Sequence, residues 1–172
     1  LLVREACANR GLSENQIDQI VQGNLAVDKK QGKDEQFLHA MVSEENVKEE
    51  GYEVAVNKAD EKRAEEDKKN IELFQKDMDW NALGALLHTI QDSNSPSHKG
   101  NQIWYEGGVA NPKNWSHPLG DVGTINPKAY QQALDGTNKM LDALGLPKQK
   151  VQEKPQISVQ MLYRKEKKKD NF

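Results

Sequence analysis

An apolar stripe at helical spacing between residues 80 and 90 places the strongest constraint on the fold. Its members are Trp80, Leu83, Leu86, Leu87 and Ile90. Apolar residues at these intervals lie on one face of an α-helix, so the stretch predicts a helix at the centre of the core. The stripe is followed by residues 92–97, whose Asp, Asn, Ser and Pro side chains favour a turn.

Two other helices have clear start signals. Ser13 is followed three residues later by Gln16, which is a capping-box pattern, and apolar residues then recur at helical intervals. Asn126 and Pro127 provide a capping residue and a proline at the first helical position, again ahead of an apolar pattern. We therefore expect an all-α fold.

The remaining segments complete this organisation. The charge-rich stretch 43–76 predicts one or two solvated helices, to which we assign no chemistry. Residues 97–126 are rich in Gly and Pro and predict a long irregular loop, and 157–159 carry the only weak strand signal. We expect one helical domain over residues 1–147, followed by a charged, flexible tail at 148–172.

Composition excludes several kinds of protein. A chain of 172 residues is long enough for one domain with a real core. Its net charge of −3 provides no overall basic field for nucleic acid or an anionic membrane. Cys7 is the only cysteine, which excludes an intramolecular disulfide and a thiolate metal cluster. No apolar run reaches the length of a transmembrane helix. The chain starts at Leu1 without a signal peptide, so we expect a piece of a longer polypeptide.

The histidines form the pattern that indicates chemistry. They are His39, His88, His98 and His117. His88 and Asp92 are four residues apart on the central helix and therefore share a face, and His117 and Asp121 have the same spacing. Without cysteine, imidazole nitrogen and carboxylate oxygen are the ligands that zinc takes. Each pair alone has a simpler interpretation, a helix-surface ion pair or a hydrogen-bonded core histidine.

The run from Leu83 to His98 is more specific than either pair. It reads LGALLHTIQDSNSPSH, with a histidine, an aspartate four residues later and a histidine ten residues later, around a turn that contains proline. This segment resembles the signature helix of zinc-dependent phospholipases C and of the single-strand-specific nucleases that share their fold. His117 and Asp121 match the later pair of that family. The resemblance covers about residues 20–125.

The resemblance implies a helical scaffold with two zinc sites. The first would be held by Asp28, His39, His88 and Asp92. The second would be held by His98, His117 and Asp121. A third site of the family uses a histidine near the N-terminus, but no histidine precedes His39 here, so we expect two ions. Asp28 and Asp92 are the candidate catalytic residues, Asp28 as acceptor of a proton from water.

A metal-dependent phosphoric ester hydrolase of the phospholipase C type is the implied function, in which metal-activated water attacks the phosphodiester. The absence of a basic stripe favours phospholipid as substrate, whereas Asp121 in place of glutamate favours single-stranded nucleic acid. Trp104, Tyr105 and Trp115 lie in the long loop and are candidates to contact acyl chains or stack on bases. They are equally compatible with a role in pinning the loop to the body. Ser93, Ser95 and Ser97 are better explained as turn residues than as nucleophiles.

The same string of residues also resembles C-terminal toxin domains of Rhs-type polymorphic toxins. That resemblance implies a secreted effector for interbacterial competition, delivered into a target bacterial cell by an upstream Rhs-type polypeptide. A cognate immunity protein would be its partner. An alternative of a different class is a helical binding module that keeps the scaffold without catalysis.

Overall fold

The computed structural model describes residues 2–115 and 126–149, and within them the chain is mostly helical, as predicted. The shorter helices and turns are α1 (Leu2–Cys7), η1 (Lys33–His39), α3 (Glu44–Glu50), η2 (Gly108–Ala110) and η3 (Pro112–Asn114). The main helices are α2 (Glu14–Asp28), α4 (Tyr52–Asp77), α5 (Trp80–Asn94) and α7 (Pro127–Ala143). Of the predicted features, His117, Asp121, the strand at 157–159 and most of the tail lie outside the described residues.

The predicted helix starts are confirmed in atomic detail. The Ser13 hydroxyl accepts from the Gln16 backbone N–H, and the Gln16 side chain accepts from the Ser13 backbone N–H, which completes a capping box at α2. At α7, the Asn126 side chain accepts from the Ala129 backbone N–H. These contacts satisfy N–H groups that have no partner within the first turn of a helix.

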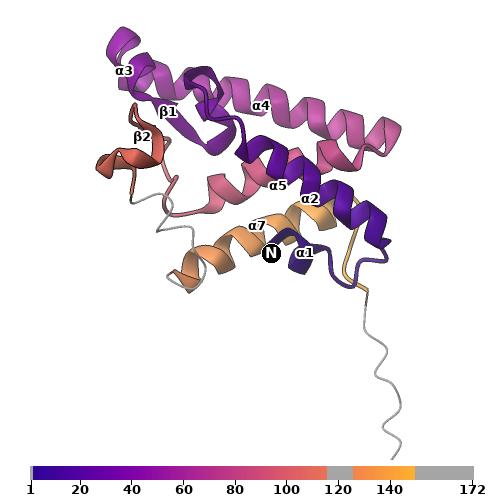
Figure 1. Cartoon of the computed structure of the whole chain (residues 1–172). Helices are drawn as coiled ribbons and strands as arrows, with labels where there is room; N and C mark the ends of the chain where they lie inside the picture. The colour runs from indigo at the N-terminus through magenta and orange to yellow at the C-terminus, as the bar shows by residue number, and fades with distance from the viewer. Residues whose placement is uncertain (1, 116–125, 150–172) are drawn as a thin grey trace, which may run out of the picture.

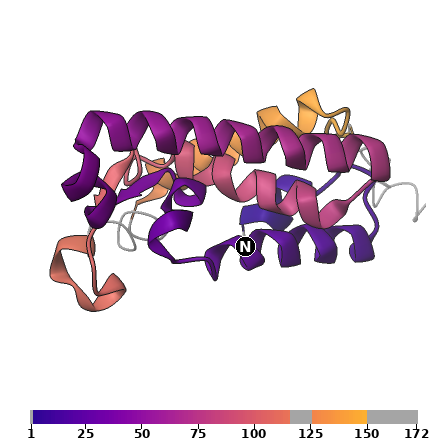
Figure 2. The same ribbon diagram turned by 90° about the horizontal axis from the view of Figure 1, so that it is seen from above.

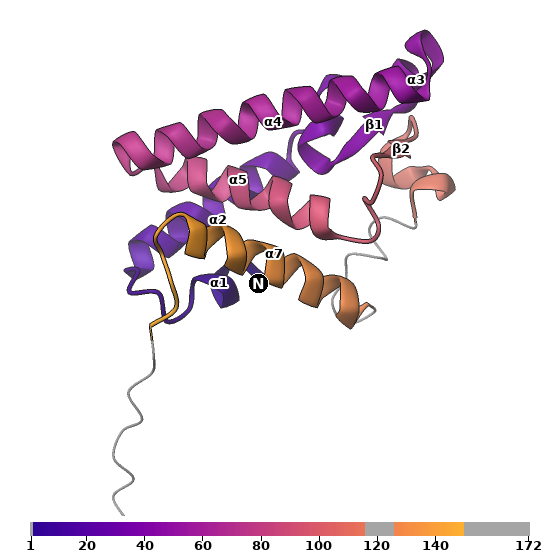
Figure 3. The same cartoon turned by 180° about the vertical axis from the view of Figure 1, so that it is seen from behind.

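Helix α5 is the centre of the core, as its apolar stripe predicts. It lies between α4 and α7 (Figures 1 and 3) and also packs against α2. Viewed from above, α4 runs along most of the length of the molecule (Figure 2). The core takes buried side chains from α1, α2, α4, α5 and α7, and its fully buried members include Ile20, Leu83, Leu86, Leu87 and Leu141.

Helices α2 and α5 approach each other closely through two glycines. A Cβ atom on Gly84 would lie 2.0 Å from the Ile20 carbonyl oxygen, and one on Gly23 would lie 2.1 Å from that of Asn81. Only glycine fits at such a backbone approach. Gly23 meets the start of α5, whereas Asp28, at the end of α2, meets a later turn of it. The two helices therefore run in the same direction.

A two-stranded parallel sheet is the feature that the sequence did not predict. Strand β1 (Met41–Ser43) pairs with β2 (Gln102–Trp104) in a register that places Met41 opposite Gln102. A second, smaller core lies beside the sheet, with Val42, Ala55 and Ala59 as its buried members. Because β1 follows η1 and β2 follows the turn after α5, the sheet holds these two connections together.

Candidate metal centre

Three elements bring four of the predicted ligands together. Asp28 is the last residue of α2, His39 is the last residue of η1, and His88 and Asp92 lie one turn apart on α5. The glycine contact between α2 and α5 places Asp28 beside His88, because each of these residues follows the contact by about one turn. The chain then folds back through η1 and places His39 against α5.

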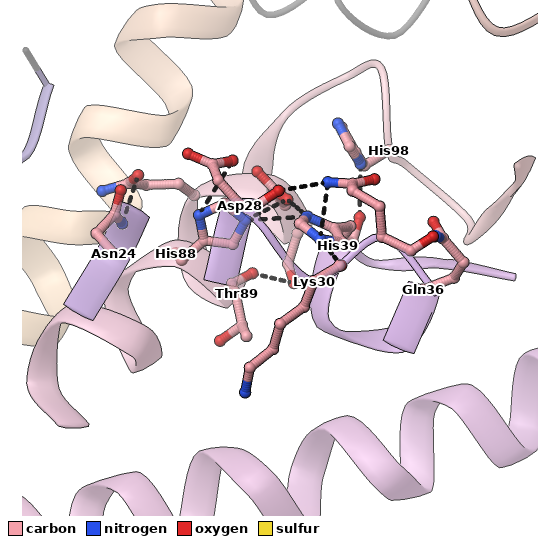
Figure 4. A network of polar contacts seen from close by, with 12 residues as sticks. Asn24, Asp28, Lys30, Gln36, His39, His88, Thr89 and His98 are labelled. Atoms are coloured by element: carbon pink, nitrogen blue, oxygen red, sulfur yellow. Dashed lines mark hydrogen bonds and ion pairs between the residues drawn. The ribbon is translucent and has the colours of Figure 1, made fainter. Parts of the chain in front are cut away.

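Three side-chain atoms form a nearly equilateral triangle. His88 Nε2 lies 3.0 Å from His39 Nδ1, and Asp92 Oδ2 lies 3.1 Å from each of these nitrogens. Figure 4 shows the rings of His39 and His88 turned toward each other. Zinc binds nitrogen and oxygen ligands at about 2.0–2.1 Å, so neighbouring donors in a tetrahedral site lie about 3.3 Å apart. The triangle therefore has the dimensions of one face of such a site.

The far side of the His39 ring fixes its tautomer. His39 Nε2 lies 2.9 Å from the backbone carbonyl oxygen of Lys30, which can only accept, so Nε2 donates. Nδ1 then presents its lone pair to the triangle. Histidines that bind metals usually donate their second ring N–H to a carbonyl or carboxylate in this way. The Gln31 side-chain amide donates to the Asp28 carbonyl oxygen at 2.8 Å and lies 3.3 Å from His39 Nε2.

The electrostatics of the cluster keep a negative charge at its centre. Burial raises the pKa of Asp92, but the polar contacts with His39 and His88 and the charges of His88 and His98 outweigh burial and hold that pKa well below its usual range. Burial lowers the pKa of His88, but the hydrogen bond to Asp92 and the charges of Asp92 and Asp28 outweigh it and raise that pKa above the usual value. An ionised carboxylate between two buried imidazoles is an environment that favours a cation.

Asp28 lies at the edge of this cluster. Its Oδ1 atom is 3.8 Å from His88 Nδ1, and its side chain is largely exposed. Asp28, His39 and His88 form a group whose donor atoms lie close enough together to hold one metal ion. Together with Asp92, these are the four residues predicted for the first metal. We refer to Asp28, His39, His88 and Asp92 below as the four-residue cluster.

His98 lies next to the cluster but is joined to it through the backbone. It is buried in the turn after α5, and its Nδ1 donates to the His39 carbonyl oxygen at 2.6 Å. Because Nδ1 contacts the backbone, a metal bound by His98 would have to use Nε2. The other two residues predicted for the second metal, His117 and Asp121, lie outside the described residues.

A cavity of about 700 Å³ lies near the cluster, on the side of Gln31. Gln31 lines the cavity and lies 3.3 Å from His39 Nε2, so this residue connects the cavity to the cluster, although none of the four cluster residues lines the cavity. Of the predicted substrate-binding residues, Trp104 and Tyr105 line this cavity. Trp115 is not among its lining residues and lies half exposed after the short η3 turn (Pro112–Asn114).

Three of the five charged residues that line this cavity come from the stretch 43–76, to which we assigned no chemistry. Ser43 caps α3, and the carboxylates and lysines just after it form part of the wall. The lining charges are Lys33, Glu44, Glu45, Lys48 and Glu106. Lys33 pairs with Glu45 at 2.7 Å, and Lys48 pairs with Glu44 at 2.9 Å. The capping serine was a usable signal for the start of α3, but the distant β2 segment that completes the cavity had none.

Asn114 supports the aromatic wall of the cavity and was also missed. This buried side chain accepts from the Tyr105 backbone N–H at 2.9 Å and donates to the carbonyl oxygens of Tyr105 and Gly108, each at 2.8 Å. Lys113 lies over the Tyr105 ring, with Nζ 4.6 Å from its centroid. The loop that carries Trp104 and Tyr105 is thus held by its own polar contacts.

Comparison of the chain with protein-family models, with curated proteins and with solved structures finds no match in any of the three. Among the described residues, no helix is both long enough and apolar enough to cross a membrane. The function has to be argued from the cluster and the cavity.

Proposed function

We propose that this chain is a metal-dependent phosphoric ester hydrolase of the phospholipase C type. One observation carries the proposal: His39 Nδ1, His88 Nε2 and Asp92 Oδ2 lie 3.0–3.1 Å apart, so two imidazoles and one carboxylate meet at a single point. These donors suit zinc or a similar divalent ion. The resemblance of residues 83–98 to the phospholipase C and nuclease family adds the phosphate ester as the bond that is cut.

The chemistry is divided between the ion and the side chains. A divalent ion bound here supplies Lewis acidity, which lowers the pKa of water and neutralises charge that develops on a phosphoryl oxygen. His39 and His88 would hold the ion from two different elements, and Asp92 would contribute negative charge at this largely buried position. The exposed carboxylate of Asp28 is the candidate to accept a proton at the solvent edge of the cluster.

The cavity favours a phospholipid over a nucleic acid. Three carboxylates line it, and both lining lysines already pair with two of them. A polyanion that tracks along this wall would meet like charge and would gain little from counterion release. A lipid presents one phosphate, and Trp104 and Tyr105 offer apolar surface to the glycerol and acyl groups next to it. Hydrolysis of single-stranded nucleic acid by the same cluster remains the second candidate, which the resemblance supports.

The biological setting is proposed from the resemblance alone. The Rhs-type string between Leu83 and His98 supports a toxin domain that is delivered into a target bacterium and neutralised by an immunity protein. A helical binding module that uses the cluster only for stability is the competing proposal.

Metal content and substrate cleavage test these alternatives together. We expect the unchelated protein to contain zinc and to release a phosphorylated head group from phospholipid vesicles. His88→Ala and Asp92→Asn should abolish both, whereas Asp34→Asn, which removes a charge from an exposed site on η1, should change neither. A protein without metal after incubation with zinc would overturn the proposal, and a metal-loaded protein that cleaves single-stranded DNA but not lipid would favour the second candidate.

A further inference from the structure

We propose that Gln36 is a positioning residue of the metal centre. It holds the turn between α2 and η1, residues 29–32, in the shape that lets the Lys30 carbonyl oxygen orient the His39 ring. This inference rests on the proposed function, because it concerns the same metal. Gln36 was not among the residues predicted from the sequence.

Gln36 and His39 face the same turn of the chain. They lie three residues apart in η1, and a 3₁₀ helix has three residues per turn, so their side chains project from the same side. Both residues are buried, with exposed fractions of 1% and 3%. Figure 4 shows Gln36 and Lys30 next to His39. Helix η1 therefore presents an amide and an imidazole together to residues 29–32.

The side-chain amide of Gln36 holds this turn by two hydrogen bonds. Its Nε2 atom donates to the carbonyl oxygen of Gln31 at 3.0 Å and to that of Gly32 at 3.2 Å. The Lys30 carbonyl oxygen accepts from His39 Nε2 at 2.9 Å. The peptide groups that carry the Lys30 and Gln31 carbonyls are adjacent and are joined by only two rotatable bonds. Fixing the Gln31 carbonyl therefore restricts the direction of the Lys30 carbonyl.

The same turn carries other parts of the site. Asp28, which precedes it, belongs to the four-residue cluster, and its backbone carbonyl oxygen accepts from the Gln31 side chain at 2.8 Å. Gln31 also lines the cavity. Gln36 thus acts on the cluster and on one wall of the cavity through a single short segment of backbone.

The other atom of the Gln36 amide argues against a role in stability alone. Oε1 is buried and has no hydrogen-bond partner among the described residues. A buried acceptor in this state lowers stability, and an apolar side chain of similar shape would avoid that loss. Departures of this kind from good packing are expected at functional sites. The contacts of Nε2 with residues 31 and 32 are then the reason for an amide at this position.

Cobalt binding by the whole chain tests the inference. Co²⁺ reports the number and type of its ligands through its visible absorption bands, and a titration gives its affinity. Gln36→Met keeps the length of the side chain and removes the donor. We expect the wild-type bands, because the metal ligands are unchanged, with an affinity lower by about 10- to 100-fold. Gln19→Met is the control, because Gln19 donates to Asn15 on the exposed face of α2, and it should match the wild type.

Two further measurements separate positioning from a purely structural role. In the zinc-loaded protein, the ¹⁵N chemical shift of His39 Nε2 should move in Gln36→Met, while that of His88 Nδ1 stays in place. Urea denaturation of the metal-free protein should give Gln36→Met a midpoint close to that of the wild type, because the unpaired Oε1 is removed together with the contacts of Nε2.

The outcomes distinguish this inference from the proposed function. Wild-type cobalt affinity in Gln36→Met would overturn the inference. If that variant did not fold without metal, Gln36→Leu would take its place, and loss of the fold in both would make Gln36 a structural residue and also overturn the inference. Absence of cobalt binding in the wild type would overturn both the inference and the proposed function. Wild-type cobalt binding without hydrolysis of any phosphate ester would overturn the proposed function alone.

Discussion

The Nε2 atom of His88 lies 3.0 Å from the Nδ1 atom of His39, although the two residues are 49 positions apart in the chain. Two ring nitrogens at this distance must share either a proton or a cation. His39 donates through its other nitrogen to the Lys30 carbonyl oxygen. The contact with the ionised Asp92 carboxylate favours a cation, and a divalent ion satisfies all three atoms at once.

Zinc should therefore stabilise the folded chain. A ligand present at 100 times its dissociation constant adds about 2.7 kcal/mol to the free energy of unfolding. We expect thermal unfolding after removal of metal with a chelator to occur at a lower temperature than after addition of zinc. His39→Ala and His88→Ala should each remove this difference.

The two histidine variants also locate the ion. If His88→Ala retained the full zinc-dependent rise in the unfolding temperature, the ion would bind at another place, and the four-residue cluster would not be the metal centre. Far-UV circular dichroism of each variant without metal checks that the helices are intact before the comparison is made.

Gly84 controls the approach of α2 and α5, and through it the position of the cluster. A methyl group at this position would lie 2.0 Å from the backbone oxygen of Ile20, which cannot move away as a side chain can. We expect Gly84→Ala to lower the free energy of unfolding by more than about 3 kcal/mol, measured by urea denaturation. It should also weaken zinc binding, because His88 lies one turn after Gly84.

Gly145 is the matched control for this substitution. It has a positive φ of 81° and no atom within 4 Å of an added Cβ. Gly145→Ala should therefore cost only the backbone strain, about 1 kcal/mol, and leave zinc binding unchanged. If Gly84→Ala and Gly145→Ala lowered the free energy of unfolding equally, the close approach of α2 and α5 would not depend on glycine.

Local signals predicted the helices well. Ser13 and Asn126 are capping residues whose contacts depend on a few neighbours in the sequence, so the sequence alone determines where α2 and α7 begin. His88 and Asp92 share a helix face by their spacing, and this part of the site also follows from local geometry. The positions of Asp28 and His39 were predicted only by resemblance, because their approach to α5 depends on tertiary packing.

Contacts between distant segments were not predictable. Strands β1 and β2 are three residues each, too short for an alternating pattern, and β1 is buried throughout. The six residues of α1 are likewise too few for a helical period. The cavity joins the region after β1 to the loop after β2, and no local pattern links Glu44 to Tyr105. A glycine within each of two helices, Gly23 and Gly84, was the one available sign of a close crossing.

Asp67 gives the chain a specific pH dependence. Partial burial raises its pKa above the usual value, and the hydrogen bond from the Thr89 hydroxyl, at 2.5 Å, only partly offsets this. The folded state therefore holds the Asp67 proton more tightly than the unfolded state. The stability that protonated Asp67 contributes is fully present below the pKa of Asp67 in the unfolded chain. It is lost as pH rises through the pKa of Asp67 in the folded protein.

Asp67→Asn isolates this effect, because its amide oxygen still accepts from Thr89. We expect the free energy of unfolding of Asp67→Asn, relative to the wild type, to be more favourable at pH 7 than at pH 4. Urea denaturation at the two pH values measures the difference. A relative stability that does not change between them would mean that the pKa of Asp67 is the same in both states.

Arg10 joins α1 to the end of α7 from a fully buried position. Its guanidinium donates to the Asp142 carboxylate at 2.5 Å, to the Asn138 side-chain oxygen at 2.7 Å and to the Leu146 carbonyl oxygen. The Arg10 side chain is 0% exposed, and its Nε donates to the Ala6 carbonyl oxygen at 2.7 Å, so all its donors depend on partners within the protein. Lysine has fewer donors and no planar fork, and it would leave several of the acceptors without a partner.

Arg10→Lys should therefore lower the free energy of unfolding by about 1–3 kcal/mol, the cost of leaving buried acceptors without a donor. Arg4 is the control, because it also pairs with carboxylates, Glu14 and Asp18, but its side chain is 48% exposed. Arg4→Lys should lower the free energy of unfolding by less than about 0.5 kcal/mol. If urea denaturation gave the two variants the same stability, the contacts of Arg10 would not hold α7 in place. In that case the packing of Leu134 and Leu141 against α5 would hold α7 in place without help from Arg10.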